Sequence, residues 1–172
     1  MFSGFKDISG KVTVNSSGWV LDKEGSEILK DITVSKSGEV IQRIQVRYVV
    51  DNSFVDDEME ESLKSLIGNT RHLALVYAPA IGAGDGYLAF RITTMESKSS
   101  AFAPVSTSDT AQHSVLAFQS ESDVTQVVRF FATGEDVLFE LMGMDSKPVV
   151  KFIVPNELGF EDLNKRLHAH GN

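Results

Sequence analysis

Histidines are the residues of this chain best suited to acid–base or metal chemistry, and four are present: His72, His113, His168 and His170. The chain has no HExxH pair, and His168 and His170 are two residues apart, so they diverge on a helix. His113 follows Asp109 in a serine-rich segment, which allows a Ser–His–Asp arrangement in principle. No GxSxG motif presents a nucleophilic serine. We expect no metal site, and a small hydrolase or ligand-binding carrier built around the His113 loop remains the alternative function.

Two other segments could bind a ligand. The glycine-rich segment 82–86, GAGDG, could hold a phosphate through its backbone amides, but it lacks the GxGxxG spacing and the P-loop lysine and precedes a strand. The acidic run 56–61 lacks the alternating oxygen ligands and the glycine of an EF-hand loop. We interpret the first as a flexible hairpin connection and the second as the solvated start of a helix, and we expect no cofactor.

Tyr87 and Arg91 are the predicted binding residues. They fall on one face of a strand-like stretch whose other face carries Leu88, Phe90 and Ile92. Exposed tyrosine and arginine are enriched among the residues that contribute most to protein–protein binding. The pair therefore predicts a recognition patch, although a cross-strand salt bridge is the more ordinary explanation of Arg91.

Composition limits the class of protein. The chain has 172 residues, of which 42% are hydrophobic and 23% charged, as in an ordinary globular protein, so we expect a single domain, 1–172. A formal net charge of -8 opposes nucleic-acid binding, because phosphate contacts require lysine and arginine. The absence of cysteine excludes disulfides, thiolate metal sites and a cysteine nucleophile. The expected partner is a protein.

Membrane insertion is not expected, because no run approaches the roughly 20 apolar residues of a membrane-spanning helix. The first residues lack the pattern of a signal peptide. The expected location is cytoplasmic for the chain as written, and periplasmic if a signal peptide was removed. The sequence does not indicate an oligomeric state.

Alternating hydrophobic residues predict strands through most of the chain. A hairpin is expected around the turn 15–18, followed by strands at 31–35, 39–51, 72–78, 87–94, 114–118, 135–142 and 149–155. On strand 39–51, the predicted buried face is Val40, Ile44, Val46, Tyr48 and Val50. Helices are expected at 51–70, from Ser120 or Ser122 to about Thr133, and at 159–170. The stretch 95–113 is interpreted as a loop, and Trp19 as a core residue.

These elements predict an α+β fold, mainly an antiparallel β-sandwich with two or three short helices. Three segments resemble the TagO/VasI-like accessory proteins of type VI secretion: SGWVLDKEGSEILKDI at 17–32, AFRI at 89–92, and the helix, hairpin and closing helix of 122–167. Proteins of the invasion-associated locus B type have a similar ending. This chain differs from both families in having no cysteine pair. The resemblance implies an accessory role and supplies no catalytic residue.

The preferred function is therefore non-enzymatic protein–protein recognition, as an accessory factor of a bacterial secretion or phage–host system. Exposed edge strands and the serine-rich loop are the expected contact surface. An enzyme is the less favoured class.

Overall fold

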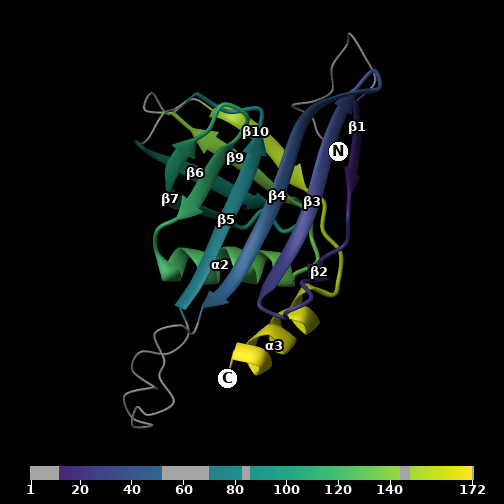
Figure 1. Ribbon diagram of the computed structural model, residues 1–172, viewed down its shortest axis with the longest axis vertical. Helices are drawn as coiled ribbons and strands as arrows, with labels where there is room; N and C mark the ends of the chain where they lie inside the picture. Colours follow the sequence, from purple (N-terminus) through teal and green to yellow (C-terminus); the bar gives the residue numbers. More distant parts are fainter. Residues whose placement is uncertain (1–11, 52–69, 83–85, 144–147, 172) are drawn as a thin grey trace.

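The computed structural model describes residues 12–51, 70–82, 86–143 and 148–171, which form one antiparallel sheet with two helices (Figure 1). The strands are β1 (Val12–Ser16), β2 (Val20–Leu21), β3 (Glu27–Lys36), β4 (Glu39–Asp51), β5 (Thr70–Ala78), β6 (Gly86–Thr94), β7 (Ser100–Asp109), β8 (Ser114–Phe118), β9 (Val137–Met142) and β10 (Pro148–Val154). The helices are α2 (Glu121–Ala132) and α3 (Phe160–Gly171). The helix predicted at 51–70 lies outside the described residues.

The strand order is β1-β3-β4-β5-β8-β7-β6-β9-β10, and β2 pairs with β3. All the pairings in the described part of the chain are antiparallel. The sheet curves strongly, because β5 and β10 are far apart in this order while the rings of Tyr77 and Phe152 lie 5.9 Å apart. The prediction of a β-rich α+β fold is confirmed at this level.

The inner face of the curved sheet forms the hydrophobic core. On β4, Ile44, Val46 and Tyr48 are buried, as the alternation predicted, while Arg43 is exposed on the other face. Val40 is an exception, because 40% of it is exposed. Val34 of β3 pairs with Gln42 of β4, but the next residue, Ser35, pairs with Val40. This irregularity adds one residue to β4 and interrupts its alternation before Gln42.

Three predicted connections are wrong. The stretch 95–113 contains β7, a ten-residue strand inside the sheet, and is not a loop. The segments on either side of the turn 15–18 do not form a hairpin with each other, since β1 and β2 both pair with β3. The glycine-rich segment 82–86 joins β5 to β6, which pair with other strands, so it is not a hairpin connection.

Helix α2 begins and ends as the sequence predicted. The side chain of Ser120 caps its first turn by accepting a hydrogen bond from the Asp123 amide. Gly134 follows the C-cap with φ of 77°, a conformation that glycine adopts without strain. Val124, Val127, Val128, Phe130 and Phe131 are buried. Figure 1 shows both helices at one end of the sheet. Neither helix of the described chain has the length and apolar character needed to cross a membrane.

The first prediction concerns Val127, which is completely buried. Val127→Asp should abolish cooperative thermal unfolding. It removes about 1.5–3 kcal/mol of apolar burial and places an unpaired charge in the core, against a total stability of about 5–15 kcal/mol. Ser122→Ala is the control, because Ser122 is exposed on the same helix and should change the free energy of unfolding by less than about 0.5 kcal/mol. Cooperative melting of Val127→Asp at the parent temperature would contradict this packing.

Candidate functional site

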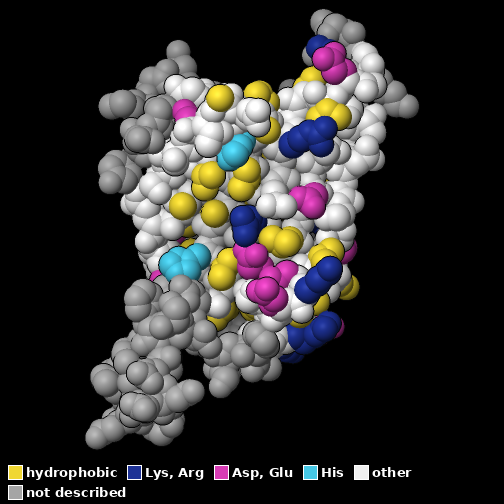
Figure 2. Space-filling view, in the orientation of Figure 1, with side chains coloured by type: hydrophobic (Ala, Val, Ile, Leu, Met, Phe, Trp, Pro, Cys, Tyr) yellow, Lys and Arg dark blue, Asp and Glu magenta, His cyan; other side chains and the backbone are white. Residues whose placement is uncertain are grey.

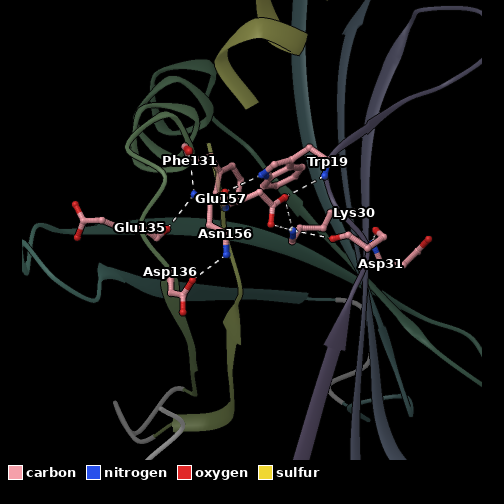
Figure 3. Close-up of polar contacts among 9 residues, drawn as sticks. Trp19, Lys30, Asp31, Phe131, Glu135, Asp136, Asn156 and Glu157 are labelled. Carbon is pink, nitrogen blue, oxygen red and sulfur yellow. Dashed lines mark hydrogen bonds and ion pairs between the residues drawn. The ribbon is translucent and has the colours of Figure 1, made fainter. Parts of the chain in front are cut away.

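A group of polar contacts joins the segment around Trp19 to the segment after β10, and Asn156 is at its centre (Figure 3). Its Oδ1 accepts hydrogen bonds from Trp19 Nε1 at 2.7 Å and from the Glu157 amide at 2.9 Å. Its Nδ2 donates to the carbonyls of Phe131 and Glu135, both at 2.9 Å. The amide therefore uses two acceptor and two donor positions.

Lys30 belongs to the same group and is fully buried. Its Nζ donates to the Ser17 carbonyl at 2.9 Å and to Glu157 Oε1 at 3.1 Å, and it lies 5.0 Å from the centre of the Trp19 ring. The Glu157 side chain is 48% exposed, so the pair is solvated on one side only. Because these polar atoms already have partners and the lysine is closed to solvent, we interpret the group as a structural connection.

Arg91, a predicted binding residue, projects from the outer face of β6, between two buried neighbours, Phe90 and Ile92. It makes the cross-strand salt bridge that the sequence allowed, with Nε 3.0 Å from Glu140 Oε1 and Nη2 3.2 Å from Oε2. These contacts with Glu140 raise the pKa of Arg91 above its ordinary value. On the other side, Phe102 of β7 stands directly opposite Arg91 and is 58% exposed.

Tyr87, the second predicted binding residue, is in β6, opposite Ser106 of β7. Its side chain lies outside the described part of the structure. The pairing of Tyr87 with Arg91 as one patch therefore stays a prediction. The structure places Phe102 beside Arg91, and the sequence interpretation missed it because residue 102 was assigned to a loop.

The predicted histidine site lies at the turn between β7 and β8. Ser114 is buried, and its hydroxyl donates to Asp109 and accepts a hydrogen bond from the Ile81 amide at 2.8 Å. The Nδ1 atom of His113 is 3.3 Å from Thr110 Oγ1. The serine thus contacts the carboxylate directly, without an intervening imidazole, and Ser114, His113 and Asp109 do not have the order of contacts of a catalytic triad.

His113 instead lines a hollow of about 530 Å³ on the outer face of the sheet, together with Asp31, Thr33, Arg43 and Gln45. Figure 2 shows this face, on which hydrophobic side chains gather over β5 and charged ones lie beside them over β4 and β3. The sequence interpretation missed this hollow, because its residues come from β3, β4, β5 and the β7–β8 turn.

Trp19 and His72, which were also singled out from the sequence, lie in different parts of the fold. Trp19 is buried in the core, as predicted, where it packs against Phe131 and Phe160. His72 is exposed on β5. The acidic run 56–61 and the side chains of His168 and His170 are not among the described residues. Within the described ranges, no three histidine, aspartate or glutamate side chains converge to hold a metal ion.

The side chain of Glu135 connects the loop after α2 to the turn after β6 through hydrogen bonds. Its Oε1 accepts hydrogen bonds from the Glu96 amide at 2.9 Å and the Ser97 amide at 2.7 Å. The Ser97 amide, which favours the charged carboxylate, lowers the pKa of Glu135 below its ordinary value of 4.5, and slight burial opposes this only in part. The ionised carboxylate therefore stabilises this turn.

No match to this chain is found among protein-family models, among curated proteins or among solved structures. The resemblance to TagO/VasI-like accessory proteins therefore stays a hypothesis based on the three segments named above.

The second prediction concerns Asn156. Asn156→Ala should lower the free energy of unfolding by about 2–4 kcal/mol, because Trp19 Nε1 and the carbonyls of Phe131 and Glu135 each lose a partner, at about 1–3 kcal/mol for a buried group. Urea unfolding followed by the fluorescence of Trp19, the only tryptophan, measures this. Asn15→Ala, at an exposed position of β1, is the control. Equal effects of the two variants would refute the structural role of Asn156.

The third prediction concerns pH. Because the pKa of Glu135 is lower in the folded protein, its contribution to stability is full above the ordinary value of 4.5 and is lost as the pH falls through the folded value. Glu135→Gln should therefore be less stable than the parent at neutral pH, and the difference should shrink in acid. Urea midpoints measured across the acidic range test this, with Glu24→Gln, at an exposed position, as the control. A difference that grows in acid would contradict it.

Proposed function

We propose that this protein recognises another protein through the outer face of β6, β7 and β9. The observation that carries the proposal is the exposure of Phe102 directly opposite Arg91. Pro104, also exposed, follows on the same face of β7, opposite Ala89. We call Arg91, Phe102 and Pro104 the Phe102 patch. Arginine and aromatic residues are the types enriched where protein interfaces derive most of their affinity.

The position of the Arg91 guanidinium favours binding. Two hydrogen bonds to Glu140 hold it, and the Glu140 side chain is itself mostly buried. A side chain that is already held in one orientation loses less conformational entropy when a partner binds. The salt bridge and the recognition role are therefore compatible, because Arg91 has further donors on its exposed side.

We also propose that the curved sheet is a β-sandwich, with β3, β4 and β5 facing β6, β9 and β10. The contact between Tyr77 of β5 and Phe152 of β10 supports this arrangement. A sandwich has two outer faces that point away from each other, so the Phe102 patch and the hollow beside His113 would serve different ligands.

The biological setting rests on the resemblance alone. The resemblance to TagO/VasI-like proteins suggests that this protein is an accessory factor of a bacterial secretion or phage–host system. The second candidate function, a ligand-binding carrier with a site beside His113, is supported by the hollow of about 530 Å³ that this residue lines.

The fourth prediction tests the Phe102 patch. The parent protein, used as bait in extracts of its native host, should capture a partner identified by mass spectrometry. The double variant Arg91→Ala, Phe102→Ser should reduce capture by about tenfold or more, because hot-spot residues each contribute about 2 kcal/mol or more.

Val20→Ser is the matched control, because Val20 is an exposed hydrophobic residue of β2, outside the patch. It should capture the same partner as the parent. Circular dichroism shows whether each bait is folded. Equal capture by the double variant and the parent, or recovery of the bait alone, would contradict the proposal.

A further inference from the structure

Arg43 is a cation without a partner among the described residues. It lies on the outer face of β4, where the register places it opposite Thr33 of β3 and Ala78 of β5. Arg47, four residues further along the same face, is 2.7 Å from Glu27. Arg43 has no hydrogen bond or ion pair with any residue of the described chain. Its planar set of donors is therefore available to a ligand.

Two hollows meet at Arg43. The first, of about 530 Å³, contains Asp31 and His113 and has apolar lining from Val76 and Ala78. The second, of about 330 Å³, lies beyond Arg43 and Ala78, and Gln42 lines it. Each volume falls in the range of about 300–1,000 Å³ that is usual for small-ligand sites.

Asp31 provides the opposite charge. One carboxylate oxygen, Oδ1, accepts a hydrogen bond from Gln45 Nε2 at 2.9 Å. Asp31 and Arg43 are diagonal neighbours on paired strands, a spacing of roughly 7–8 Å between backbones. They form no ion pair with each other in the described structure. The hollow thus has a cation and an anion that are not paired with each other.

We propose that this hollow binds a small α-amino acid, with its carboxylate on Arg43 and its ammonium group on Asp31. The guanidinium fork matches a carboxylate in two parallel hydrogen bonds. A phosphate ion would fit this hollow less well, because the carboxylate of Asp31 would repel it and its second negative charge would have no partner. Val76 and Ala78 would contact an apolar side chain of the ligand. This site is independent of the Phe102 patch, which lies on other strands.

The test is a titration of the isotope-labelled protein, followed by amide NMR signals, with L-alanine, acetate, methylammonium and inorganic phosphate as separate probes. L-alanine should shift the signals of Thr33, Arg43 and His113 in a saturable way. Acetate should bind more weakly, and methylammonium and phosphate should cause no saturable shift. Arg43→Gln should weaken alanine binding by about tenfold or more, because it removes charge-assisted hydrogen bonds.

Arg47→Gln is the control, because Arg47 lies on the same face of the same strand and already pairs with Glu27. It should leave alanine binding unchanged. Both side chains are exposed, so both variants should fold, and their melting temperatures check this. The proposal is overturned if alanine causes no saturable shift, if phosphate binds more tightly than alanine, or if the two variants weaken binding equally.

Discussion

The aromatic rings on the inner face of the sheet can leave water only if the sheet curls around them, and the rest of the structure depends on this constraint. Phe139 and Phe152, on adjacent strands, stack at 5.4 Å, and Phe90 meets Phe139 edge-on at the same distance. Phe131 of α2 joins them from the end of the sheet. A buried aromatic side chain contributes about 1.5–3 kcal/mol, more than the roughly 1 kcal/mol of a typical hydrogen bond. Hydrophobic burial therefore provides most of the stability.

Burial alone does not decide which segments meet, because the hydrophobic effect has no direction. The hydrogen bonds of Asn156 do have direction, and they join the segment around Trp19 to the end of α2 and to the chain after β10. Lys30 adds a buried charge that is acceptable only with its partners in place. This polar group therefore fixes the position in which the segment around Trp19 meets the end of α2 and the segment after β10.

Sequence reasoning succeeded where the signal was local and failed where pairing was distant. The period of Val124, Val127 and Val128 defined α2 because their neighbours lie within the same helix. Strand β7 was missed because its inner face is built largely from small and polar residues such as Ala103 and Thr107, which give a weak alternating signal. The exposure of Arg91 was predictable, but the identity of its neighbours depends on the register of three strands. For the polar group around Asn156, the available sequence signal was Lys30, which occupies an inward position of the alternating segment ILKDITV.

With the inner face committed to packing, contacts with other molecules must use the outer faces and edges. The outward arginines differ in a way that composition does not explain, since 24 acidic residues accompany 16 basic ones. Arg91 lies directly opposite Glu140, and Arg47 reaches Glu27 diagonally across the strand pair. The acid at the same diagonal position from Arg43 is Asp31, which accepts a hydrogen bond from Gln45 instead. The charge of Arg43 is therefore left without a partner among the described residues, although its position in the sheet resembles that of Arg47. An arginine whose charge no neighbour neutralises presents a stronger field to solvent than one held by a carboxylate, so Arg43 and Arg91 should select different ligands.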